Sequence, residues 1–121
     1  MNDGAQDRRA LEQQLLRVGE LIISSDREGD VYTIRPTGEL DLATAPILQG
    51  ELERVEATDV RSIVVDLAGL TFMDSTGVRL LLSANARSRV DGGRLLLLRG
   101  PAAVQRVLKL SGVEPLLPFT D

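Results

Sequence analysis

The chain has 121 residues, of which 43% are hydrophobic and only 2% aromatic, and this composition predicts a single domain with an aliphatic core. Histidine and cysteine are both absent, which excludes a Ser-His-Asp triad, histidine phosphotransfer, thiolate chemistry and disulfides, and we expect neither a metal nor another cofactor. The net charge of −4 argues against direct binding of nucleic acid, and no apolar run reaches the roughly 20 residues of a membrane span, so we expect a cytoplasmic protein that binds other proteins.

The first 18 residues are mostly polar. Within them Leu11, Leu15 and Val18 follow one another at helical spacing, which is typical of an amphipathic helix. We therefore expect a partly helical N-terminal extension over residues 1–18, followed by a domain over residues 19–121.

The domain is predicted to open with an antiparallel hairpin. Leu21-Ile22-Ile23 begins one strand, residues 26–30 form a polar turn, and residues 31–35 return as the second strand. Pro36 is expected to end or bend this strand, because proline cannot donate a hydrogen bond to a ladder. Residues 38–41 (Gly-Glu-Leu-Asp) then form a short extended piece that leads to a helix.

The rest of the chain alternates helices and strands. A helix is expected from about Thr44, since Pro46 then lies in its first turn, where the missing N–H costs nothing. The following elements are a buried strand at 63–65, a helix at 75–90 that stops before Gly92-Gly93, a strand at 95–98, a helix with Val104, Val107 and Leu108 facing inward, and a short final strand at 113–117. This order predicts an α/β fold with a mixed β-sheet, in which parallel crossover units follow the hairpin.

The segment Asp74-Ser75-Thr76-Gly77 follows a buried strand and opens the longest predicted helix. The N-terminus of a helix has unpaired N–H donors and a partial positive charge, so a serine there can act as a cap, a phosphate acceptor or a nucleophile. Capping alone does not require two hydroxyls after one carboxylate. It also does not require Gly77, which we expect to leave the backbone uncovered where a large partner could approach.

Other carboxylates suggest other chemistries, each with a simpler alternative. The Asp-Ser/Thr-Gly loop of aspartic proteases does not match, because two residues separate Asp74 from Gly77. Asp66, at the end of a strand, resembles a receiver-domain acceptor, but the chain opens with a hairpin and its only lysine, Lys109, lies in a predicted helix. Asp41 also closes a strand, and it is expected either to cap the next helix or to form an acidic rim beside Ser75.

Three sequence motifs, taken with the order of elements, resemble one known family. Gly-Glu-Leu-Asp at 38–41 precedes the first core helix, Phe-Met-Asp-Ser-Thr-Gly at 72–77 precedes the second, and Leu-Ser-Gly-Val at 110–113 lies near the end. Over about residues 20–118 the chain resembles the STAS domain, and within that family it resembles the bacterial anti-sigma factor antagonists. The resemblance implies a STAS-like mixed sheet with helices packed mainly on one face.

The resemblance also implies a function without catalysis by this chain. In the family, the serine that matches Ser75 is phosphorylated by an anti-sigma factor that is also an ATP-dependent serine kinase. The unphosphorylated form binds the anti-sigma factor and releases the sigma factor, and a serine phosphatase restores that form. The residues that would line the docking surface are Asp41, Asp74, Thr76 and Gly77.

The chain departs from the family pattern in two places. Arg79 stands where relatives often have a glycine, and it could reach Asp74 or a phosphate, crowd the partner surface, or remain a solvated arginine. Members of the family usually continue into a C-terminal helix, and the domain over residues 19–121 is expected to lack this helix. Residues 7–18 could cover the apolar patch that such a helix protects, and an uncovered patch would favour a weak homodimer.

Two alternative functions remain open at the level of sequence. The first is an architectural STAS subunit of a signalling or membrane transport assembly, with Ser75 unmodified. The second is an enzyme that uses Asp74 or Asp66, although the sequence offers no second catalytic group.

Overall fold

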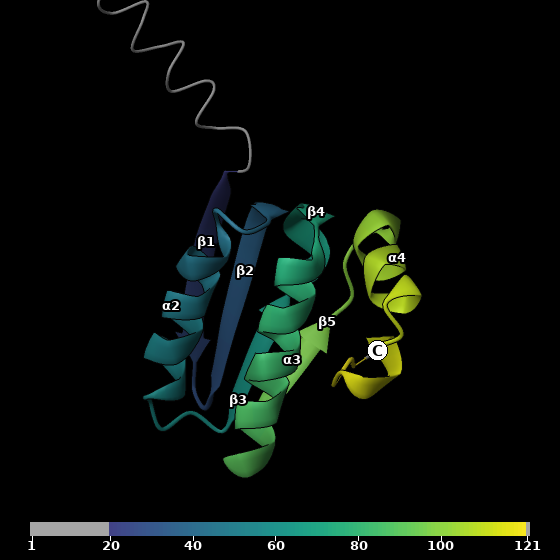
Figure 1. Ribbon diagram of the computed structural model, residues 1–121. Helices are drawn as coiled ribbons and strands as arrows, with labels where there is room; N and C mark the ends of the chain where they lie inside the picture. Colours follow the sequence, from purple (N-terminus) through teal and green to yellow (C-terminus); the bar gives the residue numbers. More distant parts are fainter. Residues whose placement is uncertain (1–19, 121) are drawn as a thin grey trace, which may run out of the picture.

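The computed structural model describes residues 20–120, so the expected extension over residues 1–18 lies outside the described residues. The elements are β1 (Leu21–Glu28), β2 (Val31–Leu40), α2 (Ala45–Glu56), β3 (Ser62–Asp66), the 3-10 turn η1 (Leu67–Gly69), β4 (Leu70–Met73), α3 (Ser75–Val90), β5 (Leu95–Leu98), α4 (Ala102–Leu110) and the 3-10 turn η2 (Glu114–Leu116) (Figure 1). The predicted helix at 75–90 is confirmed at both ends.

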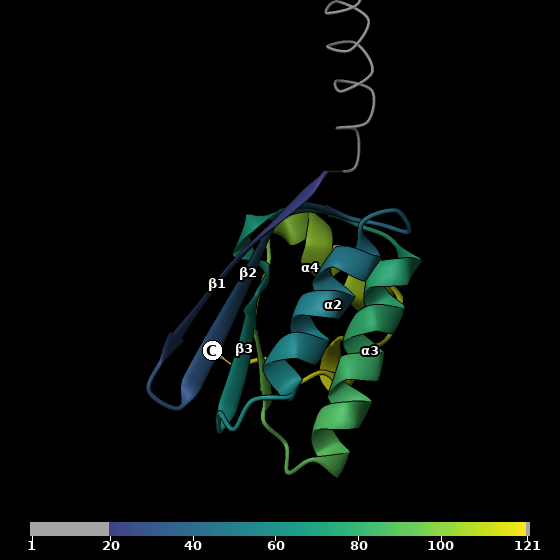
Figure 2. The same ribbon diagram turned by 90° about the vertical axis from the view of Figure 1, so that its left-hand side faces the viewer.

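The strands form one mixed sheet in the order β1-β2-β3-β5. β1 and β2 are antiparallel, while β3 and β5 continue the sheet in parallel. Figure 2 shows α2, α3 and α4 on the same side of this sheet. The predicted mixed sheet with helices mainly on one face is therefore confirmed.

β4 is a strand that the sequence analysis did not identify. β3 pairs with β2 as far as Ile34, the chain then makes the turn η1, and β4 pairs with β2 from Gly38 onward. Pro36 falls in the interval between these two pairings and is opposite Ile23 of β1. Of the two effects expected of Pro36, ending its strand is wrong. β2 continues through Pro36 because neither β3 nor β4 pairs with it at that point, so the missing N–H breaks no ladder on that side.

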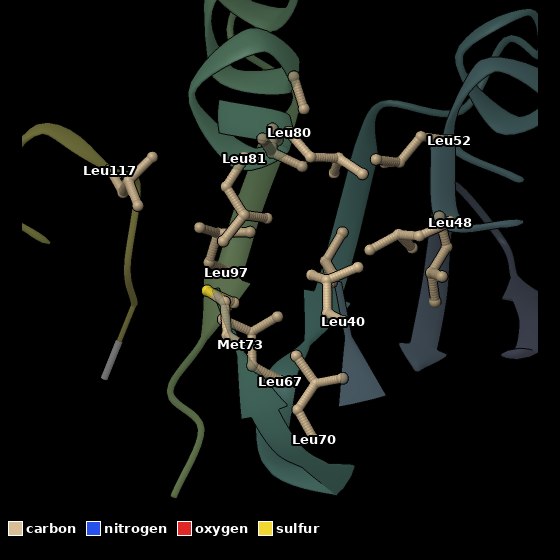
Figure 3. Packing of buried hydrophobic residues seen from close by; sticks show 14 of the residues in the cluster. Leu40, Leu48, Leu52, Leu67, Leu70, Met73, Leu80, Leu81, Leu97 and Leu117 are labelled. Atoms are coloured by element: carbon tan, nitrogen blue, oxygen red, sulfur yellow. The ribbon is translucent and has the colours of Figure 1, made fainter. Parts of the chain in front are cut away.

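The core lies between the sheet and the helices. Leu40 of β2 meets Leu48 and Leu52 of α2 on one side and Leu81 of α3 on the other (Figure 3). The core is aliphatic, as predicted, and the largest fully buried side chains of residues 20–120 are Ile34, Leu40, Leu48, Leu52, Val55, Val60, Val65, Leu67, Leu70, Leu81, Leu97 and Leu108.

The final strand expected at 113–117 is also wrong. This segment contains η2, in which the N–H of Leu116 donates to the carbonyl of Val113 at 2.9 Å, and Pro115 suits the start of such a turn. The chain rejoins the sheet only afterwards, through a parallel bridge between Leu97 and Phe119.

Candidate functional site

The two motifs at 38–41 and 72–77 meet at one edge of the sheet. β2 and β4 run parallel, so their carboxyl ends lie together, and Asp41 and Asp74 follow these ends directly. The backbone N–H of Asp74 donates to the carbonyl of Leu40 at 3.3 Å, which joins the two segments. This edge lies at the upper end of the sheet in Figure 1, where α2 and α3 both begin.

Asp74, and not Ser75, is the N-cap of α3. Its backbone is extended, and its Oδ1 accepts a hydrogen bond from the N–H of Thr76 at 2.9 Å. Ser75 is the first residue of the helix. Its side chain is exposed, and within residues 20–120 its hydroxyl has no hydrogen-bond partner. Of the three roles open to Ser75, capping is therefore taken by its neighbour.

Asp41 organises the turn between β2 and α2. Its Oδ1 accepts hydrogen bonds from the N–H groups of Ala43 and Thr44, each at 3.0 Å. The Thr44 side chain, which is only 4% exposed, donates from its hydroxyl to the carbonyl of Glu39 at 2.7 Å. The sequence analysis assigned no role to Thr44. The only feature of the sequence that could have indicated this role is the position of Thr44 directly before Ala45 and Pro46, where α2 begins.

The carboxylates of Asp41 and Asp74 each use only one oxygen, Oδ1, in their hydrogen bonds to described residues. Neither the Oδ2 of Asp41 nor that of Asp74 accepts a hydrogen bond from any described residue, and neither side chain forms an ion pair there. Both side chains are only half-buried, so these oxygens can interact with a partner. The capping role and the acidic rim are therefore compatible, because each uses a different oxygen of the same carboxylate.

Gly77 does not expose backbone, and the sequence-based expectation on this point is wrong. Gly77 is buried, and a Cβ at this position would lie 2.7 Å from the Cγ of Met73 and 3.0 Å from the Cδ2 of Leu40. The missing side chain instead lets the first turn of α3 lie close to β2 and β4. Gly77 thus contributes to the site through packing, because it allows the start of α3 to lie against the sheet.

A shallow apolar hollow of about 360 Å³ lies between α2 and α3 beside this edge. Its lining residues are Leu42, Ala45, Pro46, Gln49, Thr76 and Leu80. Leu42 stands out, because 76% of its surface is exposed in the loop that Asp41 organises. The sequence analysis missed it, since one leucine in a loop carries no periodic signal.

Arg79 lies one turn beyond Ser75 on the exposed surface of α3. It forms no ion pair with Asp74, which was one of the contacts considered from the sequence. Arg79 therefore belongs to the surface beside Ser75 and not to the cap of the helix.

The structure gives little support for other kinds of site. Asp66 caps η1, with its Oδ1 accepting from the N–H of Ala68 at 3.0 Å, in keeping with the simpler of its two interpretations. Across residues 20–120 no three histidine, cysteine, aspartate or glutamate side chains are grouped so that they could hold a metal ion. Among the described helices, none is both long and apolar enough to cross a membrane.

Comparison with known proteins gives a consistent set of matches. The model of the STAS domain family matches residues 23–121. An anti-sigma F factor antagonist of Paenibacillus polymyxa is 28% identical over 102 residues, which cover 84% of this chain and 87% of the relative. A solved anti-sigma factor antagonist from Mycobacterium paratuberculosis is similar with a TM-score of 0.74 at 22% identity, covering 84% of this chain and 86% of that one.

A further solved relative is known in two covalent states. The anti-sigma factor antagonist SpoIIAA in its unphosphorylated form matches with a TM-score of 0.68 and 26% identity, over 83% of this chain and 87% of that one. The phosphorylated form of SpoIIAA from Bacillus matches with a TM-score of 0.63 and 25% identity, over 83% of this chain and 90% of that one.

Proposed function

Because this chain belongs to the STAS domain family, we propose that it acts as an anti-sigma factor antagonist that is switched by phosphorylation of Ser75. The unphosphorylated protein binds an anti-sigma factor with serine kinase activity, and the sigma factor is released. Phosphorylation of Ser75 prevents this binding, and a serine phosphatase restores it. The chain itself is a substrate and a binding partner, and it needs no catalytic group of its own.

The exposed Ser75 hydroxyl at the start of α3 is the observation that carries the proposal. It has no partner in the described part of the chain, and it follows a carboxylate that already caps the helix. A kinase can therefore take this hydroxyl without breaking a bond that holds the fold. The relative SpoIIAA has been solved with and without phosphate, which supports phosphorylation as the switch.

The docking surface that we propose surrounds Ser75. It consists of Asp41, Asp74, Thr76 and Arg79, together with Leu42 at the rim of the apolar hollow. The free Oδ2 atoms of the two aspartates suit basic side chains of the partner, and the hollow suits one apolar side chain. The occupant is the anti-sigma factor, since this surface is continuous with the acceptor serine.

Phosphorylation would switch this surface by charge. A phosphate adds about −1.5 to −2 charges at neutral pH. The start of α3 tolerates an anion, because the helix dipole is positive there, so the fold is retained. Beside Asp41 and Asp74, however, the new charge repels a partner surface that is matched to two carboxylates and a neutral serine. The switch thus acts by blocking the interface and not by refolding.

Binding measurements with matched variants test this proposal. We expect Ser75→Asp to weaken binding of the cognate anti-sigma factor by at least about tenfold in a calorimetric titration. Ser83→Asp serves as the control, because Ser83 is an exposed serine further along the same helix and the change in charge is equal. If Ser75→Asp binds as tightly as the wild type, the switch is wrong.

The same titration examines the apolar part of the surface. We expect Leu42→Ala to weaken binding by roughly tenfold if Leu42 is an anchor. Leu110→Ala is the control, since Leu110 on α4 is equally exposed, at 78%, and lies away from Ser75.

Incubation with ATP and the anti-sigma factor, followed by mass spectrometry, locates the phosphate. The proposal expects it on Ser75 and not on Thr76. A stable complex with no modification would favour the architectural role instead.

A further inference from the structure

Arg79 is placed to interact with whatever Ser75 carries. The two residues are four positions apart on α3, so their side chains lie on the same face, one turn apart. Long side chains on a helix point back toward its N-terminus, and for Arg79 that direction leads to Ser75 and Thr76. The guanidinium of an arginine at this position can therefore reach the acceptor.

Arg79 has no partner among the described residues of the unphosphorylated protein. Within residues 20–120 it makes no hydrogen bond, ion pair or ring contact, and its side chain is exposed. Two other helical arginines do have partners, since Arg54 binds Glu51 and Arg87 binds Glu56, whereas Arg89 resembles Arg79 in having none among the described residues. Asp74, five positions earlier in the chain, forms no ion pair or hydrogen bond with Arg79.

We propose that Arg79 is an internal partner for phosphorylated Ser75, and that its guanidinium holds the phosphate against the first turn of α3. The inference rests on the proposed phosphorylation of Ser75. A serine hydroxyl is neutral and offers little to a guanidinium, whereas a phosphate offers up to two charges and three acceptor oxygens that suit a bidentate arginine. The pair therefore exists only in the phosphorylated state.

This pair changes what a partner meets at the site. In the unphosphorylated protein Arg79 contributes an exposed cation, without a partner among the described residues, one helical turn from Ser75. In the phosphorylated protein that cation is occupied, and the phosphate stands fixed over the surface on which the partner would dock. Phosphorylation then removes an exposed positive charge and adds negative charge in a single step.

The test measures the phosphate itself and needs no kinase. Phosphoserine is incorporated at position 75 during synthesis, and the pH titration of its ³¹P resonance is compared between the otherwise wild-type protein and Arg79→Gln. We expect the Arg79→Gln midpoint to lie higher by at least about 0.3 of a pH unit, a twofold change in proton affinity. Asp41 and Asp74 are present in both proteins, so their repulsion of the phosphate cancels.

Two further variants make the result specific. Arg89→Gln removes an exposed arginine from the far end of α3 that has no partner among the described residues. It changes the net charge equally, so it should leave the midpoint unchanged. Arg79→Lys keeps the charge without the bidentate geometry, and it should give an intermediate midpoint. Equal midpoints for the wild type, Arg79→Gln and Arg89→Gln would overturn the inference.

The outcome is separable from that of the proposed function. If no anti-sigma factor responds to phosphorylation, the proposed function fails, but the titration still reports whether Arg79 holds the phosphate. If the titration is unaffected by Arg79 while Ser75→Asp abolishes binding, the switch stands and only the arginine pair is wrong.

Discussion

At the scale of single residues, the two aspartates of the site combine a structural role with the proposed binding role. Asp41 and Asp74 each accept hydrogen bonds from backbone N–H groups through Oδ1, while no described residue binds the Oδ2 of either. This division explains why sequence reasoning found both a structural and a functional interpretation for the same aspartates. Ser75 differs, because no part of the described fold depends on its hydroxyl.

Gly77 yields the residue-scale prediction. We expect Gly77→Ala to lower the free energy of unfolding by about 1–3 kcal/mol, because its Cβ would overlap Met73 and Leu40, which are both buried. Urea denaturation at neutral pH measures this change.

Gly50→Ala is the matched control for Gly77→Ala. Gly50 lies inside α2, and a Cβ there would meet no atom within 4 Å. Alanine favours helices over glycine, so this variant should be more stable by up to about 1 kcal/mol. A Gly77→Ala protein as stable as the wild type would contradict the packing argument.

At the scale of elements, a polar cluster fastens α2 to the hairpin. The carboxylate of Glu51 accepts hydrogen bonds from Arg54 on its own helix, at 2.7 and 2.9 Å, and from the hydroxyl of Ser25 on β1. Arg54 also donates to the phenol oxygen of Tyr32 on β2 at 2.8 Å. The cluster therefore ties the helix that precedes the site to both strands of the hairpin.

The cluster predicts a pH dependence of stability. Its hydrogen bonds from Arg54 and Ser25 lower the pKa of the Glu51 carboxyl from its ordinary value of 4.5. A lowered pKa in the folded state stabilises the protein fully above pH 4.5, and this contribution is lost as the pH falls from there through the folded-state pKa. We expect the wild type to be more stable than Glu51→Gln near pH 7, and the difference to shrink in acid.

Chemical denaturation at a series of pH values measures this difference. Glu53→Gln is the control, because Glu53 lies on the same helix and, among the described residues, its carboxylate accepts a hydrogen bond only from the amide of Gln49. If the gap between the wild type and Glu51→Gln is constant with pH, the cluster does not act through the charge of Glu51.

At the scale of the whole molecule, the site and the far end of α3 are held independently. At that far end Arg87 forms a bidentate ion pair with Glu56 of α2. Its Nε lies 3.1 Å from Oε1, and its Nη2 lies 3.0 Å from Oε2. Arg94 donates to the carbonyls of Glu56, Thr58 and Val60, and so fixes the connection between α2 and β3. These contacts lie at the opposite end of the helix from Ser75.

Phosphorylation should therefore remain a local event. We expect the proteins with serine and with phosphoserine at position 75 to differ in amide chemical shifts around the first turns of α3 and the loop after β2, and to agree at Arg87, Arg94 and β5. Two-dimensional NMR spectra of both forms make the comparison. Shifts that spread to the far end of α3 would show that the switch refolds the domain.

The sequence by itself determined the features that depend on nearby residues. The bounds of α3 follow from the Asp74 cap and from Gly92 and Gly93, both of which have positive φ. The hairpin follows from alternating strands around a turn at Gly29, where φ is +62°. The position of Ser75 at a helix start was predictable for the same reason, because caps and turns involve residues only a few positions apart.

Only the tertiary structure decided the features that depend on distant neighbours. β2 continues through Pro36 because its second partner changes from β3 to β4 at that point. Gly77 faces inward because α3 lies against Leu40, and the hollow exists because Leu42 and Thr76, far apart in the chain, are brought to one edge. The physical reason is common to all three: burial and pairing are set by the packing of whole elements, which local sequence patterns do not encode.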